Sequence, residues 1–152
     1  MPDLVARVLR GRREESIHYG SIAVVDSKGN LTHYLGDPEF FTFARSSPKP
    51  IQAMAMIQSG AADKYSFTPK QISICCGSHV GSDEHKEIVL QNLKAAGNKP
   101  ENLKCGCHVP IFMEMKKQFP TNDEHKDPLR HNCSGKHSGF LALARHIGED
   151  VA

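Results

Sequence analysis

The chain has 152 residues, of which 39% are hydrophobic and 24% are charged, and this composition is typical of a globular protein with a buried core. Its formal net charge is only +2 and the charges are scattered, so there is no electrostatic basis for binding nucleic acid or an anionic membrane. No apolar run approaches the length of a membrane span, and residues 1–13 carry too many charges for a signal peptide. We therefore expect a cytoplasmic protein with neither nucleic acid nor membrane as a partner.

The cysteine pattern favours free or metal-bound thiols over disulfides. An odd number of cysteines cannot all pair within one chain, and adjacent or nearly adjacent positions make poor disulfide partners. Without an export signal, a reducing compartment is expected. The five cysteines are Cys75, Cys76, Cys105, Cys107 and Cys133.

The first 35 residues have the pattern of β-strands. Residues 5–9 alternate weakly between apolar and polar side chains, which predicts a strand. Residues 21–26 are rich in β-branched side chains, and after a turn at 27–30 the pattern resumes at 31–35, which predicts a β-hairpin. The basic cluster at 10–13, followed by two glutamates, predicts a solvated face or turn.

Residues 46–60 predict a helix. Ser46 or Ser47 can cap its start, and Pro48 suits a first turn that has no use for its missing N–H. Apolar residues then follow at helical spacing and are expected to face the core: Ile51, Met54, Ala55 and Ile57.

The remaining elements alternate between helix and strand patterns. Thr68 and Gln71 have the spacing of a capping box, and the apolar run 72–76 predicts a short buried strand. Helices are predicted from Ser82 to about residue 96 and over 136–147. The side chains of the last helix expected to point inward are Phe140, Leu141, Leu143 and Ile147. This order of elements favours a mixed α/β fold.

Ser46 and Lys49 are three residues apart, which puts both side chains on one side of a helix. A lysine takes a proton from a serine only when it is neutral, and this requires burial or a neighbouring cation. The helix N-terminus would stabilise negative charge developing on Ser46. By itself, the same pattern is also typical of a capping serine followed by a solvated lysine.

Ser78 lies in the segment C-G-S-H-V-G, directly after the predicted strand at 72–76. Reactive side chains gather at the carboxyl ends of strands and in the glycine-containing loops that follow them. An ordinary strand-to-helix turn is the alternative interpretation.

Cys133 and Lys136 also share one helical face, near the start of the last predicted helix. A cysteine thiolate is a strong zinc ligand, His137 is a possible one, and a neutral lysine is an unusual one. The alternative is a buried thiol near a helix cap. The C-x-C-H run at 105–108 could also bind a metal but lacks a second half, so we favour buried strand thiols there.

Three segments together resemble one protein family: R-S-S-P-K at 45–49, C-G-S-H-V-G at 76–81 and R-H-N-C-S-G-K-H at 130–137. Their order and spacing are similar to those of the serine–lysine, zinc-associated L-asparaginases (the asparaginase II type), which differ from the threonine-dependent bacterial and the self-cleaving plant enzymes. The resemblance covers nearly the whole chain. It implies the α/β fold of the serine β-lactamases and glutaminases, a mixed sheet with flanking helices.

The resemblance implies hydrolysis of L-asparagine to L-aspartate and ammonia. Ser46 and Lys49 match the first serine–lysine pair of the family, and Ser78 matches the serine of the second pair. One of the two serines would attack the side-chain amide with lysine as the base, and water would hydrolyse the acyl-enzyme. Arg45 matches an active-site arginine that would bind the substrate.

Cys133 and Lys136 match two metal ligands of the family. Zinc would position the substrate and tune the lysines without being strictly required, because the serines already supply nucleophiles. Family members are roughly twice as long as this chain, so residues 1–152 would form the N-terminal part of a single L-asparaginase domain. A second lysine, a third metal ligand and a nearby aspartate would then lie in the other part. We expect the full-length protein to form a homodimer and residues 1–152 alone to hydrolyse little or no asparagine.

Two other functions stay open at this stage. One is a related serine hydrolase that acts on glutamine or a β-lactam. The other is a metal-binding fragment that lacks catalytic activity.

Overall fold

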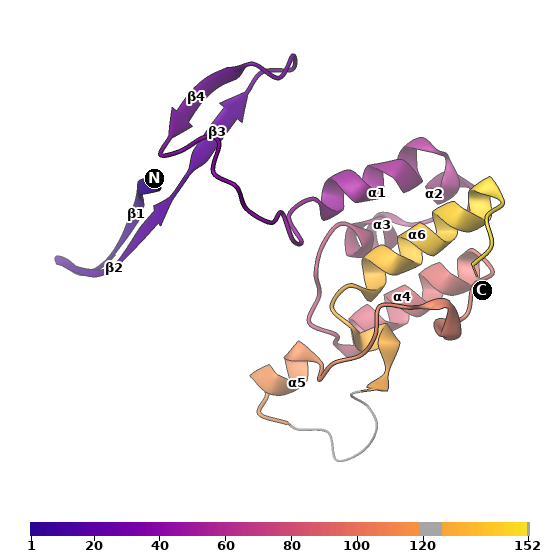
Figure 1. The fold of residues 1–152 in the computed structure, drawn as a ribbon. Helices are drawn as coiled ribbons and strands as arrows, with labels where there is room; N and C mark the ends of the chain where they lie inside the picture. The colour runs from indigo at the N-terminus through magenta and orange to yellow at the C-terminus, as the bar shows by residue number, and fades with distance from the viewer. Residues whose placement is uncertain (119–125, 152) are drawn as a thin grey trace. The chain divides into compact units, whose positions relative to one another are not determined.

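The computed structural model of the protein describes residues 1–118 and 126–151. The chain divides into two compact units, Met1–Phe43 and Ala44–Ala152, and each is considered by itself (Figure 1). Strands make up the regular structure of the first unit and helices that of the second. Among the described residues, none of the helices combines the length and the apolar character needed to cross a membrane.

The first unit consists of two antiparallel pairs of strands. β1 (Asp3–Arg10) pairs with β2 (Arg13–Gly20), and β3 (Ile22–Val25) pairs with β4 (Leu31–Leu35). The second pair confirms the predicted hairpin, whose turn is held by the Asp26 carboxylate. β2 was not predicted, because its sequence is charged and lacks the apolar alternation by which strands are recognised.

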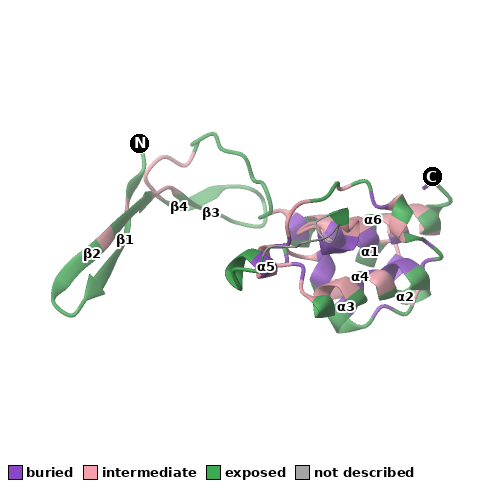
Figure 2. Ribbon diagram, turned by 90° about the horizontal axis from the view of Figure 1, so that it is seen from below, coloured by how far each residue is buried: buried purple, intermediate pink, exposed green. Residues whose placement is uncertain are grey.

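The strands of the first unit bury none of their residues, as the colouring of Figure 2 shows. Two-stranded sheets are marginally stable in water unless another element covers them. The hydrophobic core described here therefore belongs to the second unit, which also carries the candidate site.

The second unit is built around α6, which packs against α1, α3 and α4. Fully buried side chains such as Met56, Val89 and Leu93 fill the space between these helices. The helices are α1 (Lys49–Gln58), α2 (Ala61–Lys64), α3 (Pro69–Cys75), α4 (Asp83–Ala95), α5 (Ile111–Met115) and α6 (Ser134–Ile147), with 3-10 helices at Pro100–Asn102 and Pro128–Arg130.

Residues 72–75 of the apolar run belong to helix α3 and Cys76 is its C-cap, so the predicted strand is wrong. The predicted capping box is confirmed, because the Thr68 hydroxyl accepts from the backbone N–H of Gln71 and the Gln71 side chain accepts from that of Thr68. This box fixes a helical start that continues through the apolar run. A short, mostly apolar run does not by itself distinguish a buried strand from a buried helix segment.

Helix α1 confirms the predicted helix but not the details of its start. Neither serine caps it: the N-cap is Pro48, and the Ser47 hydroxyl donates instead to the carbonyl of Ala44 at 2.6 Å. The predicted core stripe is also wrong, because Ile51, Met54 and Ile57 are exposed. The buried face of α1 consists of Lys49, Ala53 and Met56.

Helices α4 and α6 begin and end close to the predicted positions. The Ser82 hydroxyl caps α4, and Gly148 ends α6 with a φ of 85°. The predicted inward face of α6 is wrong in part, since Phe140 and Ile147 are exposed and Leu141 and Leu143 are half-buried. The residues of α6 that are buried are mostly small: Ser134, Gly135, Ser138, Gly139 and Ala142.

Small residues let α6 approach α3 closely. A Cβ atom on Gly135 would lie 2.2 Å from the carbonyl oxygen of Ile74, closer than any real contact of this kind. On Gly139 it would lie 3.0 Å from the sulfur of Cys75. This close packing brings the start of α6 next to the segment that follows α3.

The mixture of helices and strands confirms the mixed α/β class. In the described part of the chain the strands form two separate two-stranded antiparallel sheets and no mixed sheet. The architecture of the serine β-lactamases therefore stays a prediction.

Candidate functional site

The side chain of Lys49 is buried, although a lysine at the first residue of a helix is usually solvated. The residue is 3% exposed. Its Nζ lies 2.8 Å from the Ser78 hydroxyl, 3.1 Å from the sulfur of Cys133 and 3.4 Å from the carbonyl oxygen of Gly77. The interpretation of Lys49 as a solvated lysine is therefore wrong.

The two predicted catalytic serines are in contact. The Ser78 hydroxyl donates to the Ser46 hydroxyl at 3.0 Å, and both residues are exposed. Ser78 thus lies between the buried amine of Lys49 and the hydroxyl of Ser46. The spacing of Ser46 and Lys49 suggested a direct contact between their side chains, whereas the described side-chain hydrogen bonds connect them through Ser78.

Arg45 lies in the turn before α1 and is exposed. Its φ is 48°, in the left-handed region that non-glycine residues rarely adopt. Backbone strain of this kind is often found beside functional groups. Its role in binding substrate stays a prediction.

Cys133 is the N-cap residue of α6 and is half-buried. Its backbone N–H donates to Nδ1 of His131 at 3.0 Å. Nζ of Lys136 lies 5.4 Å from the ring centroid of Phe140. Among the described contacts, the thiol of Cys133 therefore pairs with Lys49, and its predicted partner Lys136 packs on an aromatic ring.

The side chains near Cys133 do not complete a zinc site by themselves. In residues 1–118 and 126–151 no group of three or more His, Cys, Asp or Glu side chains is arranged to hold a metal ion. A structural zinc site takes four ligands, and a catalytic one takes three from the protein. Cys133 and Lys136 would supply two, so their role as zinc ligands stays a prediction.

The C-x-C-H run lies outside the strands, so the prediction of buried strand thiols is wrong. Cys105 is half-buried and Cys107 is exposed. Burial raises the pKa of the Cys105 thiol, and the neighbouring Cys107 acts in the same direction. His108 supports the site from this run, because its Nε2 accepts from the backbone N–H of Asn132 at 3.1 Å.

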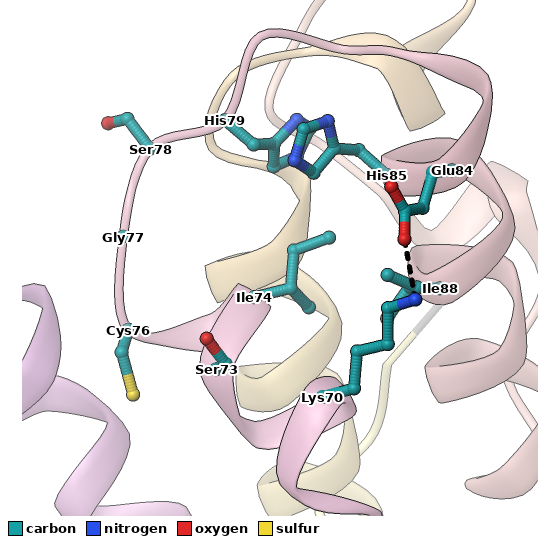
Figure 3. Close-up of a pocket in the computed structure, with 10 residues that line it drawn as sticks. All are labelled: Lys70, Ser73, Ile74, Cys76, Gly77, Ser78, His79, Glu84, His85 and Ile88. Carbon is teal, nitrogen blue, oxygen red and sulfur yellow. Dashed lines mark hydrogen bonds and ion pairs between the residues drawn. The ribbon is translucent and has the colours of Figure 1, made fainter.

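A pocket of about 520 Å³ lies between α3 and α4, beside the segment that carries Ser78. Ile74 and Ile88 line it, together with the ion pair between Lys70 and Glu84 (Figure 3). The hydroxyl of Ser78 points away from this pocket. Gly77 and Ser78 are nevertheless among the residues that line the pocket, so the pocket adjoins the Lys49–Ser78 contact.

Sequence reasoning missed the contact between Lys49 and Cys133, which are 84 residues apart. No local pattern links positions so distant. It also missed the backbone hydrogen bond from His79 to the carbonyl of Asn132, 3.1 Å long, which joins the two site segments. The only available signal was that His79 and Asn132 each lie next to a candidate site residue, Ser78 and Cys133 respectively.

A buried lysine beside a pair of exposed serines can supply a base and a nucleophile, as in hydrolases that act through an acyl-enzyme. The family model described as L-asparaginase II matches residues 6–152. The chain therefore belongs to the L-asparaginase II family, as the resemblance predicted. This membership suggests an amidohydrolase of the asparaginase type. The comparison with curated proteins gave no match.

Proposed function

We propose that the protein hydrolyses L-asparagine to L-aspartate and ammonia by acyl transfer to a serine. The observation that carries this proposal is the buried Nζ of Lys49 at 2.8 Å from the Ser78 hydroxyl, which itself contacts Ser46. A general base must lie within hydrogen-bonding distance of the proton that it removes, and this distance meets that requirement. Membership of the L-asparaginase II family supports asparagine as the substrate.

Ser46 is the attacking hydroxyl in this proposal, and Ser78 carries the proton. Because Lys49 is buried, its amine does not reach a substrate at the surface directly. Ser78 is exposed and contacts both Lys49 and Ser46, so its oxygen can take the proton of Ser46 as its own proton passes to the neutral amine. The same hydroxyl can later return the proton to the leaving nitrogen.

The reaction then proceeds in two stages. The Ser46 oxygen bonds to the side-chain carbonyl carbon of asparagine, and collapse of the tetrahedral intermediate breaks the C–N bond and releases ammonia. Water hydrolyses the resulting ester to aspartate and restores Ser46. Backbone N–H groups near Ser46 or Gly77 would stabilise the negatively charged oxygen of each tetrahedral intermediate.

Arg45 would bind the α-carboxylate of asparagine. A guanidinium forms two parallel hydrogen bonds with a carboxylate, which fixes orientation as well as position. Arg45 is exposed and directly precedes Ser46, so a carboxylate that it holds would place the rest of a short substrate near the attacking hydroxyl.

Zinc binding is a separate proposal, and none of the steps above depends on it. Cys133 and Lys136 would hold the ion together with donors from elsewhere. When bound, zinc would supply positive charge that orients the substrate. Metal analysis of the full-length protein tests this: we expect stoichiometric zinc that is lost in Cys133→Ser, and a zinc-free wild-type protein would contradict it.

For location and assembly, we propose that the full-length protein is a cytoplasmic homodimer.

Ammonia release from asparagine tests the reaction, measured in the full-length protein and in Ser46→Ala, Ser78→Ala and Ser47→Ala. We expect loss of turnover in the first two variants. Ser47 is the matched control, because its hydroxyl is engaged with the carbonyl of Ala44 and should leave turnover unchanged. Unchanged rates in both Ser46→Ala and Ser78→Ala would contradict the proposal.

Acid quenching during turnover, followed by peptide mass spectrometry, identifies the acylated serine. We expect the aspartyl adduct on Ser46. An adduct on Ser78 would reverse the roles of the two serines. Hydrolysis of glutamine and of a β-lactam is assayed in parallel. Faster hydrolysis of either one than of asparagine would contradict asparagine as the substrate.

A further inference from the structure

His79 directly follows Ser78, and its imidazole uses both ring nitrogens. The residue is 7% exposed, and its ring stacks on that of His85 with centroids 5.0 Å apart (Figure 3). Nδ1 accepts from the backbone N–H of Gly81 at 3.1 Å, and Nε2 lies 2.9 Å from the hydroxyl of Ser134.

The hydrogen bonds around the ring require one tautomer. The Ser134 hydroxyl donates its only proton to the carbonyl of Leu129 at 2.8 Å, so it accepts from His79 and Nε2 carries a proton. Nδ1 faces an N–H donor, so it carries none. These bonds are all satisfied only by a neutral imidazole protonated on Nε2.

This ring joins the segment that carries Ser78 to the start of α6. Ser134 is the first residue of α6 and directly follows Cys133. Lys49 contacts both Ser78 and Cys133, so the segments that the ring joins are the ones between which the amine lies. A small separation of the two segments would alter the distance between Lys49 and Ser78.

We infer that His79 is a positioning residue, which in its neutral form protonated on Nε2 holds Ser78 within reach of Lys49. The inference rests on the proposed function for the role of Ser78. The tautomer of the ring is independent of that function and is measured separately.

The surroundings of the ring favour its neutral form. Burial lowers the pKa of His79 to about 4. Neighbouring groups from other elements act in the same direction: His85 of α4, Lys49 of α1, His131 and His108. A second proton would sit on Nδ1, facing the N–H of Gly81, and would break that hydrogen bond.

Two amide variants separate the two hydrogen bonds of the ring. In His79→Gln the amide nitrogen can take the place of Nε2 and donate to Ser134, whereas the acceptor for Gly81 is lost. In His79→Asn the amide oxygen can take the place of Nδ1 and accept from Gly81, whereas the donor to Ser134 is lost. Only the bond to Ser134 crosses to α6, so the glutamine variant should be the more active one.

The first test is nitrogen NMR of the histidine rings in the full-length protein from pH 8 to pH 5. We expect His79 to keep a protonated Nε2 and an unprotonated Nδ1 throughout. The opposite tautomer or a charged ring in this range would overturn the inference. This readout does not depend on turnover, so it separates failure of this inference from failure of the proposed function.

The second test is kinetic. A small displacement of reacting groups can cost about 100-fold in rate, so we expect kcat to fall at least about 10-fold in His79→Asn, with KM within about 3-fold of wild type. His79→Gln should keep kcat within about 3-fold, because the side-chain bond that joins the segments is retained. Equal losses in both variants, or a change confined to KM, would overturn the inference.

His85→Gln is the matched control, since His85 stacks on His79 but its own side chain bonds within the cap of α4. We expect its kcat to be unchanged. A loss equal to that of His79→Asn would show that ring stacking, and not the bond to Ser134, positions Ser78. Thermal melts of all three variants confirm that the losses do not come from unfolding.

Discussion

Nζ of Lys49 lies 2.8 Å from Oγ of Ser78, although the two residues are 29 positions apart in the chain. Lys49 is also within 3.4 Å of two further acceptors, the sulfur of Cys133 and the carbonyl oxygen of Gly77. Three polar atoms, from Ser78, Cys133 and Gly77, therefore surround Nζ. Contacts with the Gly77–Ser78 segment on one side and with Cys133 on the other therefore hold the lysine in one place. Of the three acceptors, the Ser78 hydroxyl is the one that is exposed at the surface.

Replacing Lys49 tests whether it acts as a base or only as a positive charge. Arginine keeps the charge but does not give up its proton in proteins, and methionine keeps the length without the amine. General acid–base catalysis contributes about 10²- to 10⁴-fold, so we expect both Lys49→Arg and Lys49→Met to lower kcat for ammonia release by at least about 100-fold.

The exposed Lys94 at the end of α4 provides the control, and Lys94→Met should retain full activity. Near-wild-type turnover in Lys49→Arg would contradict a role as base. That result would indicate instead that Lys49 acts as a fixed cation.

Local sequence signals predicted the starts and ends of the helices more accurately than they predicted which faces of the helices are buried. The capping box of Thr68 and Gln71 was found because both partners lie within one turn. The buried face of α6 was misjudged because large apolar side chains were expected inside, whereas Gly135 and Gly139 face α3 and its neighbours. Close approach between helices selects small residues, and this depends on the partner helix rather than on the pattern of α6.

The candidate site shows the same division between local and distant information. Ser46, Lys49 and Ser78 were identified from motifs, and the structure places them in one connected group. The contact of Lys49 with Cys133 was not predictable, because it arises from the packing of α1 against α6. Even the connection between the side chains of Ser46 and Lys49 depends on Ser78, which comes from a different segment.

Substitution of Gly135 tests the close approach of α6 and α3. A methyl group at this position would overlap the carbonyl oxygen of Ile74, which belongs to backbone that does not move easily. Overpacking typically costs about 1–3 kcal/mol and sometimes more, and we expect Gly135→Ala to reach or exceed the upper end of that range.

Gly139→Ala is the matched comparison within the same helix. Its methyl group would meet the side chains of Cys75 and Met56 at 3.0–3.3 Å, and the flexible methionine can shift. We expect a smaller loss than for Gly135→Ala, partly offset by the better helix propensity of alanine. Urea unfolding of both variants measures the difference, and a Gly135→Ala variant as stable as wild type would contradict the packing described here.

Arg130 should be needed for the stability of the segment after Ser78. It is 8% exposed, and its guanidinium donates to the carbonyl of Gly81 at 2.9 Å and to the carboxylate of Asp83. Arg130→Ala leaves the Gly81 carbonyl without this donor, and an unsatisfied buried acceptor costs about 1–3 kcal/mol. We expect a loss of that order in urea unfolding.

Arg130→Lys separates charge from geometry. A lysine keeps the charge but lacks the planar fork that reaches two acceptors, so we expect it to recover only part of the lost stability. Arg145→Lys is the control, because Arg145 is exposed and makes one hydrogen bond with Asn98. Full stability in Arg130→Lys would show that the positive charge alone suffices.

The unfolding free energy should decrease as the pH falls from about 6.5 to about 4. The pKa of His79 is about 4 in the folded protein, against an ordinary value of 6.5, and burial is the main cause. Between these two values the unfolded chain binds a proton at this position and the folded chain does not. Stability from the neutral ring is therefore complete above pH 6.5 and is progressively lost toward pH 4. The pKa values of Asp83 and Glu84 are lowered from 3.8 and 4.5, chiefly by side-chain hydrogen bonds to Arg130 and Lys70, so their contributions are lost as the pH falls below those ordinary values.

His79→Gln removes the titrating group and keeps the side-chain bond to α6. We therefore expect its unfolding free energy, measured with urea at several pH values between 7 and 4.5, to depend less steeply on pH than that of wild type. His18→Gln, at an exposed position of β2, is measured alongside as the control for replacing a histidine. If His79→Gln and wild type showed the same slope, the folded protein would bind the proton at His79 as readily as the unfolded chain does. The ring would then not be held in its neutral form by burial.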